Sequence, residues 1–122
     1  MFRFKKFQVY KDSKEFVKFC ENVISKTKIN HNKDLTVQIR RAMLSVILNI
    51  AEGSGCDTDK EFSRFLEISL RSVYEIVAAF DFAYDINLIS ELSFKEIENK
   101  AEQICKQLNG FRRSLKNKNV QL

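Results

Sequence analysis

Hydrophobic residues recur every three or four positions along most of the chain, the spacing that places them on one face of an α-helix. Four segments carry this pattern, at residues 7–26, 34–53, 58–88 and 93–115. Because the connections between them are short, consecutive helices are expected to pack as antiparallel neighbours. The pattern therefore predicts an all-α fold, an antiparallel up-down-up-down four-helix bundle in one domain that spans residues 1–122.

Residues typical of helix ends accompany these segments. Thr58 and Glu61 have the spacing of a capping box, in which a hydroxyl accepts from the amide three residues on and a carboxylate reaches back. Ser93 and Glu96 repeat that spacing before the fourth helix. Gly53, whose missing Cβ permits a left-handed backbone, is predicted to end the second helix.

The second predicted helix has more apolar surface than one bundle can bury. Apolar residues form its core face and continue round its other side, at Val37, Leu44, Leu48 and Ala51. A helix that is apolar over about two-thirds of its circumference must pack against its own bundle on one side and another molecule on the other. The simplest such molecule is a second copy of the chain. We therefore predict a homo-oligomer whose interface includes Val37, Arg40, Leu44, Leu48, Asn49 and Glu52.

Arg40 is the charged residue that falls among the apolar positions of this helix. A charge near apolar surroundings is tolerated when an opposite charge accompanies it. Arg40 is therefore expected to pair with a carboxylate, either of its own chain or of a neighbouring subunit.

Composition narrows the class of protein. The 122 residues include no Pro and 3 Gly, which disfavours β-sandwiches and glycine-rich phosphate loops. No segment is apolar for long enough to span a membrane, and the first residues, MFRFKKFQVYK, lack the core of a signal peptide. We expect a cytoplasmic protein with no membrane partner.

The net charge of +5 is unevenly distributed along the chain. Residues 1–41 carry 11 basic and 4 acidic side chains, residues 42–102 carry 5 and 12, and the remainder carries 5 basic side chains and no acidic one. This asymmetry suggests either an anionic partner or charge-complementary packing between subunits.

An antiparallel bundle would gather many of the cations at one end, because both termini and the turn between the second and third helices lie there. Those residues are Arg3, Lys5, Lys6, Lys60, Arg64, Arg112, Arg113, Lys116 and Lys118, and the first helix adds a stripe of Lys11, Lys14 and Lys18. Such a surface could neutralise the phosphates of RNA or DNA. The alternative is a solvated helix face whose lysines pair in part with Glu15 and Glu21.

Candidate catalytic chemistry is sparse. The single histidine, His31, falls in a linker, so the sequence offers no Glu-x-x-His pairs for a di-iron site and no convincing Ser/His/Asp arrangement. Cys20, Cys56 and Cys105 lack metal-ligand spacing and are expected to be reduced thiols. We therefore expect no catalytic residue, no metal site, no cofactor and no enzymatic activity.

Three segments carry a family resemblance. They are Phe7 to Lys11 with Val9 and Tyr10, the run QIRRA at 38–42 with Ser45 and NIAEG at 49–53, and Phe62, Arg64, Phe65, Leu66, Ile68, Ser69, Ser72 and Glu75 in the third helix. Together they resemble the four-helix-bundle proteins encoded in intervening sequences of bacterial 23S rRNA genes, sometimes called S23 proteins. The resemblance extends over nearly the whole chain.

This resemblance implies a homo-oligomer, a pentameric barrel. The same superfamily includes the accessory variability determinant of diversity-generating retroelements, a basic pentamer that binds nucleic acid and a reverse transcriptase. The implied partners are therefore further copies of the chain, RNA or DNA, and a reverse transcriptase or another protein. Our leading hypothesis is a non-catalytic nucleic-acid-binding accessory factor, and the alternative is a protein-protein interaction scaffold with no nucleic-acid role.

Overall fold

The computed structural model of the chain describes the backbone of residues 1–120 and the side chains of residues 1–117. It contains four α-helices, α1 (Gln8–Lys26), α2 (Lys33–Ser54), α3 (Asp59–Asp85) and α4 (Glu91–Val120), with short 3₁₀ turns at Arg3–Lys6 and Lys28–His31. No strand occurs within residues 1–120. The prediction of an all-α fold with four helices is confirmed.

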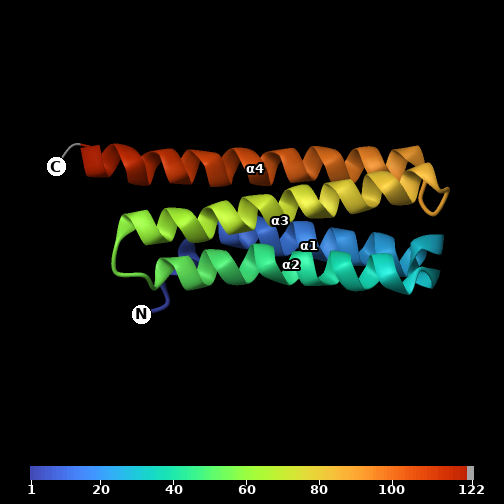
Figure 1. Ribbon diagram of the computed structural model, residues 1–122, viewed down its shortest axis with the longest axis horizontal. Helices are drawn as coiled ribbons and strands as arrows, with labels where there is room; N and C mark the ends of the chain where they lie inside the picture. Colours follow the sequence, from blue (N-terminus) through green and yellow to red (C-terminus); the bar gives the residue numbers. More distant parts are fainter. Residues whose placement is uncertain (121–122) are drawn as a thin grey trace.

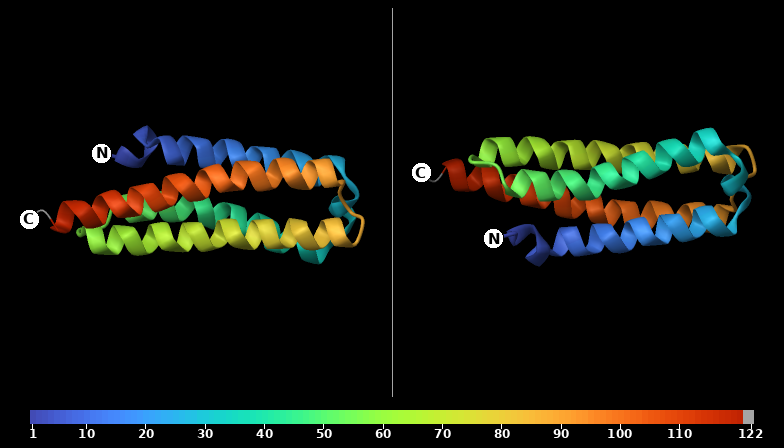
Figure 2. Two further views of the ribbon diagram at one scale, coloured as in Figure 1. Left: turned by 90° about the horizontal axis from the view of Figure 1, so that it is seen from above. Right: turned by 90° about the horizontal axis from the view of Figure 1, so that it is seen from below.

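The four helices lie along one common direction, and each connection reverses the chain (Figure 1). The helices α1, α2, α3 and α4 follow one another round the bundle, so that α4 closes it against α1. Seen from above, α4 lies between α1 and α3 (Figure 2). The most extensive packing joins α2 to α3. The N-terminus, the α2–α3 turn and the end of α4 all lie at the same end of the bundle (Figure 1).

One continuous hydrophobic core runs between the helices, and every helix contributes one apolar face to it. Its largest fully buried side chains include Phe62 and Phe80 of α3, Ile24 of α1, Ile50 of α2 and Leu108 of α4. Burial of such side chains from water is the main force that stabilises a bundle of this size. Within the described residues, no helix has an 18-residue stretch apolar enough to cross a bilayer.

Gly53 corrects one prediction from the sequence. It lies inside α2 without a left-handed backbone, and the helix continues to Ser54. A Cβ at Gly53 would lie 2.8 Å from both Phe62 Cδ1 and Phe65 Cβ of α3, closer than carbon atoms can approach. Glycine is needed here because α2 and α3 approach each other closely, and not because the helix ends.

Hydroxyl groups complete the contact between α2 and α3 further along. The buried Ser69 hydroxyl donates to the backbone carbonyl of Val46 at 2.9 Å, and the Ser72 hydroxyl donates to Ser45 Oγ at 2.7 Å. Small side chains let the helices approach, and each buried hydroxyl needs a partner such as these. The serines of the third-helix pattern therefore belong to the packing of the subunit.

Two helix ends differ from the predicted boundaries. The α3 helix ends at Asp85, where Asn87 takes a left-handed backbone (φ 65°) and the amide of Leu88 donates to the carbonyl of Ala83 at 2.9 Å, which closes the helix as a Schellman motif. The α4 helix begins at Glu91, because Ser90 caps it by accepting from the amide of Ser93 at 3.1 Å. Ser93 was predicted to be that cap.

Candidate nucleic-acid and oligomer interfaces

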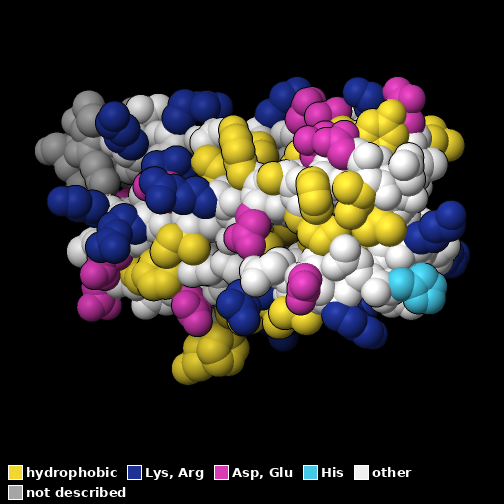
Figure 3. All heavy atoms as spheres, turned by 45° about the vertical axis from the view of Figure 1, so that its right-hand side comes forward, with side chains coloured by type: hydrophobic (Ala, Val, Ile, Leu, Met, Phe, Trp, Pro, Cys, Tyr) yellow, Lys and Arg dark blue, Asp and Glu magenta, His cyan; other side chains and the backbone are white. Residues whose placement is uncertain are grey.

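The end of the bundle that carries the N-terminus collects most of the predicted nucleic-acid-binding cations, since three parts of the chain meet there (Figure 1). We call this surface the basic end, and its members are Arg3, Lys5, Lys6, Lys60, Arg64, Arg112, Arg113 and Lys116. Lys118, which was predicted to join it, lies outside the residues whose side chains the structure describes. Figure 3 shows Lys and Arg side chains gathered toward this end of one face.

Arg3 links the first residues of the chain to the bundle. Its Nε donates to the backbone carbonyl of Ser54 at 3.1 Å, near the end of α2. Its guanidinium group lies 5.3 Å from the ring centroid of Phe62 and 5.9 Å from that of Phe7, within the range of cation–π attraction. Arg3 therefore holds the N-terminal turn against α2 and α3 while it adds positive charge.

Arg112 is similarly engaged, between α4 and α3. Its Nε donates to Ser63 Oγ at 3.4 Å, and its terminal nitrogen lies 3.5 Å from a carboxylate oxygen of Glu67. The same carboxylate pairs with Arg71, one turn further along α3, at 2.9 Å. Beside this network lies a cleft of about 320 Å³, also lined by Lys60 and Lys116.

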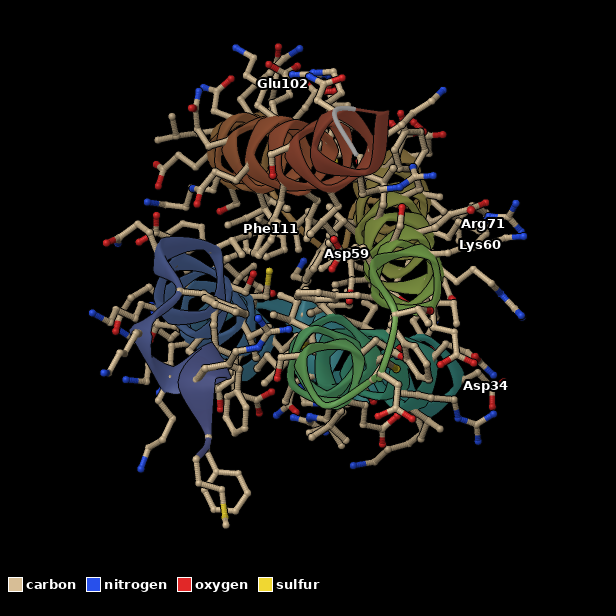
Figure 4. The ribbon with its side chains drawn as sticks, turned by 90° about the vertical axis from the view of Figure 1, so that its left-hand side faces the viewer. Asp34, Asp59, Lys60, Arg71, Glu102 and Phe111 are labelled. Atoms are coloured by element: carbon tan, nitrogen blue, oxygen red, sulfur yellow. The ribbon has the colours of Figure 1, made fainter. Side chains whose placement is uncertain are left out.

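The remaining cations of the basic end are exposed and make no ion pair within residues 1–117; they are Lys5, Lys6, Lys60, Arg64, Arg113 and Lys116. Figure 4 looks along the bundle from this end and shows Lys60 projecting away from the helices, whereas Phe111 points between them. Charges without a protein partner are free to contact phosphate oxygens. Within residues 1–117, the basic end therefore combines two anchored arginines with six cations that make no ion pair.

The predicted lysine stripe runs along the exposed side of α1, away from the basic end. Lys18 lies 3.3 Å from Glu15 in a fully solvated pair, and Lys14 lies 4.8 Å from the centroid of the Tyr10 ring. Lys11 is exposed near the start of the helix. Only the first part of this stripe continues the basic end, since each residue advances a helix by about 1.5 Å.

The outward face of α2 carries the apolar residues of the predicted oligomer interface. Val37, Leu44 and Leu48 keep 54%, 59% and 50% of their surface exposed, although they belong to a helix whose other face is buried in the core. Glu52 is exposed at the end of the same face, and Ile68 of α3 is exposed as well. Large apolar residues grouped on one surface are typical of a binding interface.

The two other predicted interface residues, Arg40 and Asn49, form hydrogen bonds within their own subunit. Arg40 donates to both carboxylate oxygens of Glu21 on α1, at 2.9 and 3.2 Å, and each side chain keeps 45% exposure. The pairing with Glu21 raises the pKa of the Arg40 guanidinium. Asn49 donates to the carbonyl of Ser45 at 2.8 Å and to its hydroxyl at 3.0 Å. Arg40 thus meets a carboxylate of its own chain, one of the two partners expected.

Sequence reasoning missed exposed apolar residues on α3, namely Tyr74 and Phe82, which keep 66% and 52% of their surface exposed. Their positions lie off the stripe of core residues that follows α3, and this departure was the available signal. They flank the side of α3 that faces away from the core, and Figure 3 shows hydrophobic side chains along this part of the molecule.

The three cysteines are free thiols, and the pKa of each is raised. Burial is the main cause that raises the pKa of Cys20, to about 12, and it also raises the pKa of Cys105. The pKa of Cys56 is raised as well, by desolvation and by the carboxylates of Glu61, Asp57 and Glu52. Within the described residues, no three His, Cys, Asp or Glu side chains are grouped so that they could hold a metal ion.

Thiol alkylation is therefore expected to be slow and selective. Cys56, in the α2–α3 turn, is expected to react first with iodoacetamide, whereas Cys20 reacts only when the chain unfolds. Because the thiolate is the nucleophile and the pKa of Cys56 is raised above 9.0, its labelling rate is expected to keep increasing beyond pH 9. Peptide mass spectrometry over a pH series measures this rate, and a plateau below pH 9 would contradict the expectation.

Comparisons with known proteins agree with this architecture. The profile of the family described as 23S rRNA-intervening sequence protein matches residues 5–110. A similar solved structure is the 1.70 Å crystal structure of a protein with unknown function from the S23 ribosomal protein family of Bacteroides thetaiotaomicron VPI-5482. The match has a TM-score of 0.77 at 24% sequence identity and covers 85% of this chain and 97% of that chain, which shows a shared fold. No curated protein matches the chain. Because the family profile extends over nearly all of the bundle, the chain belongs to the family of 23S rRNA-intervening sequence proteins.

Proposed function

We propose that this protein is a non-catalytic, homo-oligomeric accessory factor that binds RNA or DNA through the basic end. The observation that carries the proposal is the gathering of cations from three separate parts of the chain, six of which have no acidic partner within residues 1–117. Contacts to phosphates supply most of the affinity of sequence-independent nucleic-acid binding.

Self-association would strengthen this binding. The exposed apolar face of α2 supports an oligomer, for which we propose the pentamer that the family resemblance implies. Each added subunit would repeat the basic end, and linked sites bind a long polyanion far more tightly than one site does. Structured RNA is the preferred ligand in this proposal, because it presents phosphates to several basic ends at once.

A charge-reversal experiment tests the site. Arg113→Glu combined with Lys116→Glu is expected to weaken binding to a labelled RNA hairpin at least 10-fold at low salt, and to reduce the slope of log K against log salt by about 2. Both side chains are exposed, so the fold is expected to persist. Fluorescence anisotropy measures the affinity, and circular dichroism checks the helices.

The matched control carries the same change in charge at the opposite end, as Lys26→Glu combined with Lys28→Glu; both of these residues are exposed. The control is expected to bind nearly as well as the wild type, because its basic end is intact. Equal loss in both variants would show an effect of net charge alone. Absence of wild-type binding to structured RNA at low salt would refute the proposed function.

The alternative is an interaction scaffold whose partner is a reverse transcriptase or another protein. The exposed apolar residues of α2 and α3 favour it, since contacts between proteins use such surfaces. A purified partner that stays bound after nuclease treatment, and after charge reversal at Arg112 and Arg113, would favour this alternative over nucleic-acid binding.

A further inference from the structure

A groove runs along the outer side of the bundle between α3 and α4, apart from the basic end. It has a volume of about 610 Å³. Its apolar part is lined by Val77 and Ala78 of α3 and Phe94 of α4. Helix pairs that form such a groove commonly receive one apolar face of another helix.

The groove is acidic as well as apolar. Asp81, Glu98 and Glu102 line it, and Glu102 points away from the bundle in Figure 4. Glu98 lies 3.7 Å from Lys95, whereas Asp81 and Glu102 make no ion pair within residues 1–117. Among the residues whose side chains the structure describes, Lys106 is the one cation that lines this groove. A suitable occupant is therefore an apolar helix face that also carries positive charge.

The outward face of α2 has this chemistry. Val37, Leu44 and Leu48 are each at least half exposed, and Arg41, on the same side, makes no ion pair among the described side chains. Glu52 is also exposed on this side, about 16 Å further along the helix than Arg41, so the positive charge lies beside the apolar residues and the negative charge at the far end. Residues 37–48 span about 16 Å of helix, and residues 94–109, which border the groove on α4, span about 22 Å. The groove is long enough for the whole apolar face of α2.

We propose that α2 of one copy docks in the groove between α3 and α4 of the next copy. The inference rests on the proposed self-association and names the two surfaces that meet. Leu44 and Leu48 enter the apolar part of the groove, and Arg41 faces its carboxylates. Two different surfaces in contact make a head-to-tail interface, which closes into a ring when the rotation between subunits permits.

A contact of α2 with α2 of a second copy accounts for the exposed apolar residues of α2 but not for the distribution of charge. A two-fold axis near Leu44 would bring the two Arg41 guanidinium groups close together, and like charges in a contact oppose association. It would also bring no cation of the second copy to the carboxylates of Asp81 and Glu102. The distribution of charge therefore favours the head-to-tail contact.

Variants of the two surfaces test the proposal in the full-length chain. Leu44→Glu blocks the α2 face, and Ala78→Arg fills the groove with a side chain that repels Arg41; both positions are exposed in the subunit. Glu98→Lys combined with Glu102→Lys is a second groove variant that keeps the apolar lining. The matched control is Gln103→Arg, which adds a cation on the opposite side of α4. Light scattering gives the mass, and circular dichroism checks the fold.

The variant of the α2 face and the two variants of the groove are each expected to be monomers. The control, Gln103→Arg, is expected to retain the mass of the wild type. An equimolar mixture of Leu44→Glu and Ala78→Arg chains is expected to give a dimer and nothing larger, because one intact α2 face and one intact groove remain. Wild-type mass in both groove variants, or no dimer in the mixture, would overturn the inference while self-association stands. A monomeric wild type would instead refute self-association itself.

Discussion

Replacing Gly53 with valine is expected to lower the free energy of unfolding by about 3 kcal/mol, the upper part of the range for overpacked cores. A Cβ at this position would lie 2.8 Å from Phe65 Cβ, an atom that moves only with the backbone of α3. The two helices would have to separate, and the buried hydrogen bond from Ser69 to the carbonyl of Val46 would lengthen with them. Urea unfolding followed by circular dichroism measures the loss.

Alanine gives the matched comparison for this prediction. Gly53→Ala is expected to destabilise by about 1–2 kcal/mol, because the steric cost exceeds the gain of about 1 kcal/mol in helix propensity. Gly110→Ala is expected to stabilise by about 0.5–1 kcal/mol, since a Cβ there meets only the end of Arg113, at 3.8 Å. Equal effects at the two glycines would contradict the close approach of α2 and α3.

Replacing Leu44 with glutamate is expected to dissociate the oligomer, with association weakened at least about 100-fold, because an unpaired charge buried in a contact costs about 3 kcal/mol or more. In the single subunit Leu44 is 59% exposed, so the helices are expected to form as before. Leu48→Glu is expected to act in the same way. Light scattering should then report the mass of one chain, 14.3 kDa.

Leu92 supplies the control for this substitution. It is 70% exposed, in the first turn of α4, far along the chain from the α2 face. Leu92→Glu makes the same chemical change and is expected to leave the mass of the wild type unaltered. An oligomer that survives Leu44→Glu and Leu48→Glu would show that the outward face of α2 is not the contact.

The helices could be predicted because each has a continuous apolar stripe with a helical period. Their ends were harder to place. Ser90 and Ser93 are both able to cap a helix. Which of them caps α4 depends on the position and direction that the turn after α3 gives to the following residues. That turn depends on Asn87, a residue that adopts a left-handed backbone less readily than glycine does.

The prediction that Gly53 ends the second helix was wrong for a different reason. A glycine near the end of an apolar pattern can serve as a left-handed cap or as a site of close helix contact, and both uses remove the Cβ. The ring of Phe62 and the Cβ of Phe65, which decide between these uses, come from another helix. Sequence spacing alone carries no information on that distance.

The candidate surfaces also include features that could be predicted from the sequence and features that could not. The cations of the basic end could be grouped from the order and direction of the helices alone. The partner of Arg40 could not be named, because Glu21 lies on α1 and only the packing of α1 against α2 brings the pair to 2.9 Å. The groove between α3 and α4 depends on the space between two helices, and no pattern within one helix reports it.

The central claim is that an oligomer of this bundle presents repeated basic ends to nucleic acid. Native mass spectrometry of the wild-type chain with a structured RNA hairpin at low ionic strength tests both parts together. We expect a species of five chains, each of 14.3 kDa, that carries bound RNA. A spectrum of single chains, or of oligomers that never carry RNA, would contradict the account.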